Sequence, residues 1–203
     1  MNKTSSEKQP KEINSICVYC GSANNVALSY QQGARDLGAL IADQGLELVY
    51  GGASVGLMGL VADSALAGGA RVTGVMPSHL VEWELAHPNI TELVKVTSMH
   101  ERKMEMVARA DAFVLLPGGL GTLDEGFEIL TWKQLDLHDK PIIIANIDGY
   151  WDPLIQLTGH VQKQGFAPDS TPELYRVVND IAGIPEAIAQ SPRPKGTAKT
   201  KWM

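Results

Sequence analysis

Short apolar runs alternate with longer amphipathic stretches along most of the chain, and this alternation restricts the fold more than any other feature. The runs lie at residues 15–21, 46–50, 72–76, 93–97, 112–116 and 142–146. Several are apolar at every position, which is typical of strands buried on both faces of a sheet. The stretches between them predict helices at 28–43, 56–68, 99–110, 122–136, 151–163 and 180–190. Such alternation implies βαβ units, and therefore an α/β fold with a parallel sheet flanked by helices.

Glycines gather directly after three of the predicted strands. They lie in Gly21-Ser22 after the first strand, in Gly51-Gly52 after the second, and at Gly118, Gly119 and Gly121 after the fifth. The carboxyl ends of parallel strands share one edge of the sheet, where open α/β folds bind their ligands. The sequence therefore predicts a ligand crevice formed by these three turns.

The segment from Pro117 to Glu125 leaves a predicted strand and opens a predicted helix. Its glycines let the backbone approach a ligand, and the helix start adds partial positive charge, so a phosphate group is the expected ligand. The segment lacks the Gly-Lys-Ser/Thr of a P-loop, and Asp124 stands where a dinucleotide fingerprint has its third glycine. These features favour a mononucleotide or a sugar phosphate over a dinucleotide.

Glu125 has two interpretations at this stage. Thr122 and Glu125 have the spacing of a capping box, in which the glutamate bonds back to the N–H of the cap residue. A carboxylate beside a phosphate loop is electrostatically unfavourable, which instead suggests a role toward the ligand. Its neighbour Asp124 is expected to face solvent as a charge in the first helical turn.

Arg102 lies three residues after Met99 and four before Met106, so it shares a helix face with two apolar residues that should point inward. A cation on a buried stripe needs an anionic partner, either a core carboxylate or a ligand. Lys103 beside it could hold a phosphate or be solvated. Glu84, which follows the third predicted strand, could meet a purine base or pack within a loop.

Length and charge bound the class of protein. A chain of 203 residues suits one domain, predicted here at 15–190, with a disordered N-terminus at 1–14 and a disordered basic tail at 191–203. The net charge of −6 argues against nucleic acid held by a broad basic face. No apolar run reaches the roughly 18 residues of a membrane span, and the start lacks the apolar core of a secretory signal. We therefore expect a cytoplasmic protein without a nucleic-acid or membrane partner.

The residue types that most often bind metals give no metal-site pattern. Cys17 and Cys20 form a CxxC pair inside an apolar run, where side chains three apart point to opposite faces of a sheet. No second CxxC completes a zinc site, and the five histidines show no paired ligand spacing. We expect two structural thiols in a reducing compartment, and no metal.

Two motifs together resemble the LONELY GUY family, the cytokinin riboside 5′-monophosphate phosphoribohydrolases long labelled lysine decarboxylase-like. The motifs are Pro-Gly-Gly-x-Gly-Thr-x-x-Glu at 117–125 and Met-His-x-Arg-Lys at 99–103. The turns at Gly21-Ser22 and Gly51-Gly52 look like further loops of that family. The resemblance extends over about residues 15–190.

The resemblance implies a single-domain Rossmann-like fold, a homodimer and no cofactor. It also implies hydrolysis of the N-glycosidic bond of a purine nucleoside 5′-monophosphate, of the N6-modified cytokinin type, to the free base and ribose 5-phosphate. Arg102 and Glu125 would be the catalytic pair. The substrate contacts would come from Gly21, Ser22, Gly51, Gly52, Glu84, Arg102, Lys103, Gly118, Gly119, Leu120, Gly121, Thr122, Leu123, Asp124, Glu125 and Thr131.

The chemistry of the residues agrees with that assignment. Breaking the C1′–N9 bond builds positive charge on the ribose, and a carboxylate near C1′ stabilises that charge and can orient or deprotonate the attacking water. Three alternatives stay open. The protein could be a nucleosidase of broader specificity that accepts AMP, or a non-catalytic nucleotide-binding protein. It could also be a pyridoxal phosphate-dependent decarboxylase, for which Lys103 is the lysine inside the candidate site.

Overall fold

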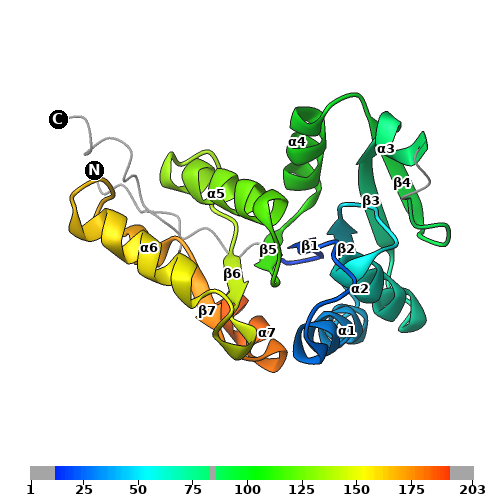
Figure 1. The fold of residues 1–203 in the computed structure, drawn as a ribbon, viewed down its shortest axis with the longest axis horizontal. Coiled ribbons are helices and arrows are strands. Elements are labelled where there is room, and N and C mark those ends of the chain that lie inside the picture. Colours follow the sequence, from blue (N-terminus) through cyan, green and yellow to red (C-terminus); the bar gives the residue numbers. More distant parts are fainter. Residues whose placement is uncertain (1–11, 83–85, 193–203) are drawn as a thin grey trace, which may run out of the picture.

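Seven parallel strands form one sheet in the computed structural model, which describes residues 12–82 and 86–192 (Figure 1). The strands are β1 (Ser15–Tyr19), β2 (Glu47–Tyr50), β3 (Val72–Pro77), β4 (Glu92–Val96), β5 (Ala112–Leu115), β6 (Ile142–Ala145) and β7 (Arg176–Val178). Their order across the sheet is β4-β3-β2-β1-β5-β6-β7, and every pairing is parallel. The predicted α/β fold is confirmed. The predicted disordered ends, 1–14 and 191–203, fall mostly outside the described residues.

Helices cover both faces of the sheet. They are α1 (Leu28–Asp43), α2 (Gly56–Ala67), α3 (Ser78–Glu82), α4 (Met99–Arg109), α5 (Leu120–Gln134), α6 (Asp152–Lys163) and α7 (Ile184–Ala189). α1, α2 and α7 pack on one face, and α4, α5 and α6 pack on the other (Figure 1). No helix within the described ranges is both long and apolar enough to cross a bilayer.

Alternate residues of β1 enter the two cores. Ile16, Val18 and Cys20 pack with α1, α2 and α7, whereas Cys17 and Tyr19 pack with α4, α5 and α6. The two cysteines therefore lie on opposite faces of the sheet, as their spacing predicts, and both are free and buried. Burial raises the pKa of both thiols well above the ordinary value, so they stay protonated.

Four elements differ from the sequence expectations. α5 begins at Leu120 rather than at residue 122, because Gly119 is the N-cap and Gly121 lies inside the helix. The five-residue α3 and the three-residue edge strand β7 were not predicted, since each is too short for a periodic pattern. Residues 181–183 form a 3₁₀ turn before α7, so the predicted helix at 180–190 is shorter than expected.

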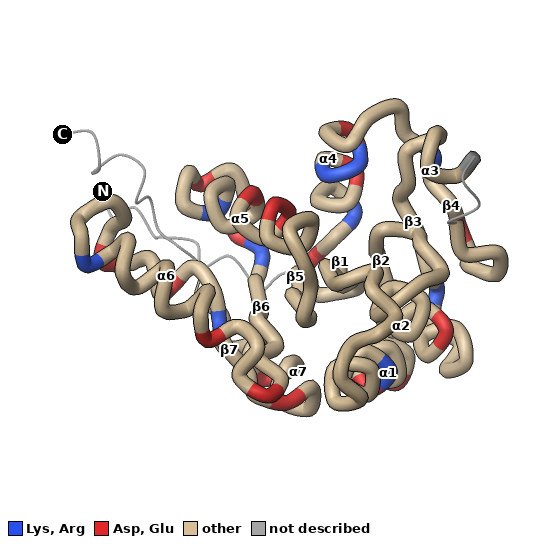
Figure 2. Tube along the Cα trace, viewed as in Figure 1, with Lys and Arg blue, Asp and Glu red and all other residues tan. Residues whose placement is uncertain are grey.

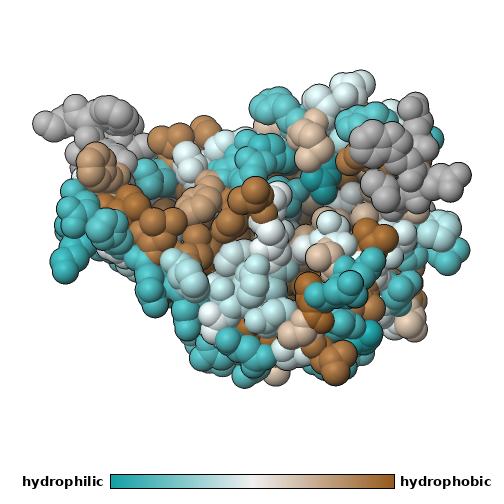
Figure 3. Space-filling view, in the orientation of Figure 1, coloured by the Kyte–Doolittle hydropathy of each residue, from teal (hydrophilic) through white to brown (hydrophobic). Residues whose placement is uncertain are grey.

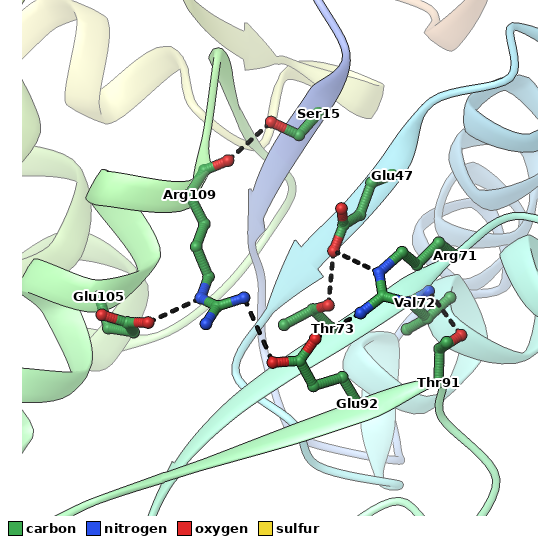
Figure 4. Close-up of polar contacts among 9 residues, drawn as sticks. All are labelled: Ser15, Glu47, Arg71, Val72, Thr73, Thr91, Glu92, Glu105 and Arg109. Carbon is green, nitrogen blue, oxygen red and sulfur yellow. Dashed lines mark hydrogen bonds and ion pairs between the residues drawn. The ribbon is translucent and has the colours of Figure 1, made fainter.

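An ion-pair network ties the amino-terminal edge of the sheet to α4 (Figure 4). Arg71 pairs with Glu92 and lies 3.5 Å from Glu47. Arg109, at the last turn of α4, bonds Glu105 at 2.7 Å and lies 3.4 Å from the same Glu92. The network therefore fixes the carboxyl end of α4 against β4, at the edge opposite the glycine turns.

The strand order reverses at β1, which lies between β2 and β5. In an open α/β sheet the ligand crevice forms at this reversal, beyond the carboxyl ends of the two central strands. The turn after β1 carries Gly21 and the turn after β5 carries Pro117, and the Gly21 N–H donates to the Pro117 carbonyl at 3.0 Å. The fold thus brings two of the three predicted glycine turns into direct contact.

Candidate active site

A buried ion pair joins α4 to α5 below the glycine turns. Arg102 Nη1 donates to Glu125 Oε1 at 2.7 Å, and Arg102 Nε donates to the Val75 carbonyl at 3.0 Å. Only 7% of Arg102 and 5% of Glu125 is exposed. Both helices carry basic and acidic positions (Figure 2), and Arg102 of α4 and Glu125 of α5 are the two that pair here. The cation expected on the buried stripe therefore has a carboxylate partner. Met106 is buried as predicted, but Met99 is 44% exposed because it lies in the first turn of α4.

Gly51 gives the guanidinium its space. A Cβ at this position would lie 2.2 Å from Arg102 Nη2. The glycine at the end of β2 is therefore required by Arg102, whatever contact it makes with a ligand. Gly52 follows with φ +84° and accepts a hydrogen bond from the His87 N–H at 2.8 Å.

Burial and Arg102 have opposite effects on the pKa of Glu125. Burial raises the pKa of Glu125, while the charge and the hydrogen bond of Arg102 lower it, and the net direction is upward from 4.5. Cys17 and Tyr19 of β1, and Cys20 directly after it, lie close enough for the Glu125 charge to help raise their own pKa values. The carboxylate thus lies in an apolar setting in which a charge on a ligand would be felt strongly.

The capping-box interpretation of Thr122 and Glu125 is wrong. The N-cap is Gly119, so Thr122 is the third helical residue, and Glu125 bonds Arg102 instead of turning back to the cap. Thr122 is buried, and its Oγ1 would lie 2.1 Å from a Cβ on Gly118. Gly118 is therefore required by packing within the loop.

Gly119 and Gly121 are different, because a Cβ on either would meet nothing within 4 Å. Neither has a positive φ, so neither packing nor backbone strain requires a glycine there. They border the start of α5, where the first N–H groups of a helix have no partner inside the helix. Leu120 between them is 86% exposed, while Leu123 packs against the core. The helix start is thus open to a ligand that approaches the backbone closely.

Lys103 is held by two carboxylates of α5. Its Nζ lies 3.2 Å from Asp124 Oδ2 and 3.1 Å from Glu128 Oε1. Burial lowers the pKa of Lys103, but the hydrogen bonds to Glu128 and Asp124 outweigh it and raise the pKa overall. The Asp124 side chain is 61% exposed, so it faces solvent as predicted, but it lies beyond the first turn of α5, because the helix begins at Leu120. Lys103 is therefore an ammonium that links α4 to α5.

The remaining residues that were predicted to contact the substrate do not all lie next to the Arg102–Glu125 ion pair. The Gly21 carbonyl accepts from the Leu57 N–H at 3.0 Å, which joins the first turn to the start of α2, and Ser22 beside it is exposed. Thr131 lies six residues after Glu125, about 120° around α5, and lines a hollow between α5 and α6 instead of the ion pair. Glu84 lies outside the described residues.

Sequence reasoning missed Tyr150, whose hydroxyl donates to the Gly118 carbonyl at 2.6 Å. The available signal was Asp148-Gly149, a dipeptide typical of turns, which lies immediately before Tyr150 and shortly after β6. Among the described residues, no three His, Cys, Asp or Glu side chains gather as a group that could hold a metal ion.

Solved structures share the fold at low sequence identity. The molybdenum cofactor binding protein from Rippkaea orientalis aligns with a TM-score of 0.67 and 21% identity, covering 89% of this chain and 98% of that one. A molybdenum cofactor carrier protein from Chlamydomonas reinhardtii aligns with a TM-score of 0.68 and 21% identity, covering 88% and 98%. These similarities show the fold alone.

Sequence comparisons are more specific. A probable cytokinin riboside 5′-monophosphate phosphoribohydrolase of Arabidopsis thaliana is 45% identical over 79% of this chain and 80% of its own length. A cytokinin riboside 5′-monophosphate phosphoribohydrolase of Oryza sativa is 47% identical over 74% of this chain and 62% of its own length. The family model described as "Possible lysine decarboxylase" matches residues 58–188. The chain therefore belongs to this family, the LONELY GUY family that its two motifs resemble.

Proposed function

We propose that this protein hydrolyses the N-glycosidic bond of a purine nucleoside 5′-monophosphate, of the N6-modified cytokinin type, to the free base and ribose 5-phosphate. The buried Arg102–Glu125 pair next to an open helix start is the observation that carries this proposal. The relatives of this chain that are named for the same reaction support it.

The start of α5 suits the 5′-phosphate. Its first N–H groups and the partial positive charge of the helix end attract an anion. The open space beside Gly119 and Gly121 lets phosphate oxygens approach the backbone. A nucleoside without the phosphate loses this contact, and we therefore expect it to be a poor substrate.

Glu125 lies at a suitable distance from the helix start to act on the reacting carbon, C1′. It lies five residues after the helix start, roughly 7.5 Å along the axis, which is about the reach of a ribose 5-phosphate. As the C1′–N9 bond breaks, its electron pair goes to the base and positive charge develops on the ribose, which the carboxylate stabilises. A water that Glu125 orients adds its oxygen to C1′, and the proton it loses balances the proton gained by the departing base. Arg102 favours the ionised form of Glu125 and orients the carboxylate.

The family description raises a lysine decarboxylase as the alternative, and Lys103 is the lysine next to the site. Forming an imine with pyridoxal phosphate requires a neutral amine. The two carboxylates instead raise the pKa of Lys103 and so favour its charged form. This observation favours hydrolysis over decarboxylation.

A second copy of the chain suits the apolar surface between α5 and α6. Phe127, Leu157 and Phe166 are 40%, 50% and 81% exposed, and they border a hollow of about 340 Å³ that Thr131 also lines (Figure 3). Thr131 lies away from Glu125 in its own chain. Any contact that Thr131 makes with a nucleotide would therefore be with the nucleotide bound to the other subunit of a dimer. We therefore include a homodimer in the proposal, together with a cytoplasmic location and no nucleic-acid or membrane partner.

Base release decides the proposal. N6-isopentenyladenosine 5′-monophosphate, AMP and the two matching nucleosides are incubated with the protein, and free base is measured by chromatography. We expect release from the first substrate, and little from either nucleoside. Equal release from AMP would replace the cytokinin assignment with a broader nucleosidase. Binding of all four without release would favour a nucleotide-binding protein and contradict the proposed activity.

A further inference from the structure

Tyr150 connects the turn after β6 to the glycine loop after β5. Its hydroxyl donates to the Gly118 carbonyl at 2.6 Å. The ring packs edge-on against Tyr30 at a centroid distance of 5.3 Å and against Trp151 at 4.8 Å. Packing on two sides of the ring therefore holds the Tyr150 hydroxyl in position.

The backbone that carries Tyr150 is anchored as well. Asp148 and Gly149 have φ values of +52° and +72°, which turn the chain sharply after β6. The Asn146 side chain closes this turn, since it accepts from the Trp151 N–H at 2.7 Å and donates to Asp152 Oδ1 at 2.8 Å. A left-handed aspartate is disfavoured, so the surrounding contacts must hold the turn in place.

The hydrogen bond fixes a peptide plane of the phosphate loop. In a trans peptide the C=O and the following N–H point in opposite directions. The Tyr150 bond to the Gly118 carbonyl therefore sets the direction of the Gly119 N–H. The Gly21 bond to the Pro117 carbonyl sets the Gly118 N–H in the same way.

Apart from Tyr150, the loop has little to hold the Gly118–Gly119 peptide plane. The Leu123 N–H donates to the Gly119 carbonyl at 3.0 Å, which fixes the next peptide plane, but a Cβ on Gly119 would meet nothing within 4 Å, and glycine has the widest backbone freedom. Without the Tyr150 hydroxyl the Gly118–Gly119 peptide could rotate and turn its carbonyl toward the anion, which would repel it. Ordering a flexible loop at binding would then weaken the affinity.

We infer that Tyr150 is a positioning residue, which holds the loop N–H groups ready for the 5′-phosphate. This inference rests on the proposed function for the place of the phosphate, and it adds a residue that touches neither the ribose nor the base.

The test is Tyr150→Phe, which removes the hydroxyl and keeps the ring between its neighbours. Ser64→Ala is the matched control, because the Ser64 hydroxyl also donates to a backbone carbonyl at 2.6 Å, that of Arg35, between α2 and α1. Steady-state kinetics with the nucleotide and calorimetric titration with the product ribose 5-phosphate are measured for both variants. For Tyr150→Phe we expect about a tenfold rise in KM and in the Kd of ribose 5-phosphate, with kcat within about threefold of the parent and the melting temperature nearly unchanged. Ser64→Ala should keep both KM and Kd.

Three outcomes would overturn the inference. The first is a Tyr150→Phe variant with parental KM and Kd. The second is an equal loss in both variants, which indicates a general loss of stability. The third is a parent protein that does not bind ribose 5-phosphate. If the parent binds this product but releases no base, the proposed reaction fails while the Kd comparison still decides the role of Tyr150.

Discussion

Gly51 lies so close to Arg102 that one added carbon would come within 2.2 Å of Nη2. Arg102 is held in turn by the Val75 carbonyl and by Glu125, so a shift of the guanidinium away from Gly51 would disturb these two hydrogen bonds. The backbone at the end of β2 therefore helps to set the position of the proposed catalytic pair, although Gly51 and Arg102 lie 51 positions apart in the sequence.

We predict that Gly51→Ala lowers kcat/KM at least about tenfold and destabilises the fold by about 1–3 kcal/mol, since it overpacks a buried site. Gly159→Ala is the control, because a Cβ there meets nothing within 4 Å. Comparison with Arg102→Ala and the double variant identifies the cause. Additive losses in the double variant would mean that Gly51 acts on the ligand and not through Arg102.

Glu125→Gln should separate chemistry from binding. It removes the charge that faces C1′, so we expect turnover to fall on the order of 10²-fold or more. The affinity for ribose 5-phosphate should change little, because the start of α5 is unaltered. The raised pKa of Glu125 means that burial outweighs the pairing with Arg102, so the neutral amide should change the free energy of unfolding by no more than about 1 kcal/mol.

Glu105→Gln is the control for that experiment, since Glu105 also loses a charge opposite an arginine, but at the far end of α4. It should keep its turnover and lose no more than about 1 kcal/mol of stability. Near-parental turnover in Glu125→Gln would show that the pair is structural and contradict the catalytic assignment.

The raised pKa of Glu125 predicts the pH dependence of the reaction. The carboxylate must be ionised, and burial favours its neutral form, so kcat/KM should fall with decreasing pH through a pKa above the ordinary 4.5. Between pH 4.5 and the raised pKa of folded Glu125, the folded state binds more protons than the unfolded state. This group therefore makes the protein more stable as the pH falls through that range. A pH profile of kcat/KM checks the prediction, and an acid limb at or below 4.5 would contradict it.

The sequence predicts the frame of this site and misses contacts that depend on how the helices pack. The apolar runs identify the sheet, and the glycines after them identify its binding edge. The start of α5 was placed too late because glycines at 119 and 121 suggest a loop, whereas a helix N-terminus tolerates them. The link from Lys103 to Asp124 and Glu128 requires the distance between α4 and α5, which no periodicity contains. Tyr150 was missed because its partner is a carbonyl 32 residues away.

The proposed dimer surface gives a direct test of assembly. Phe166→Asp places a charge in the apolar surface between α5 and α6 and should convert a dimer to a monomer by light scattering. Leu28→Asp is the control, because Leu28 is similarly exposed at 79% but lies on α1, over the opposite face of the sheet. A parent that is monomeric, or a Phe166→Asp variant that stays dimeric, would exclude this interface.

Lys133 offers a test of stability that is separate from the site. Its side chain is fully buried on α5, and its Nζ has no hydrogen-bond partner among the residues that the structure describes. Burial lowers its pKa to about 8, while the charge of Asp139 opposes the shift. The folded protein thus pays a desolvation cost at neutral pH, and Lys133→Met should raise the free energy of unfolding at pH 7 on the order of 1–3 kcal/mol.

Between pH 8 and the pKa of an unfolded lysine, near 10.4, the unfolded parent binds more protons than the folded parent. The parent therefore gains stability across that range, and the advantage of Lys133→Met should shrink between pH 7 and about pH 10. Melting curves at both pH values, with exposed Lys163→Met as the control, measure this difference. A variant that is less stable than the parent at pH 7 would show that the amine has a stabilising partner and that the desolvation argument is wrong.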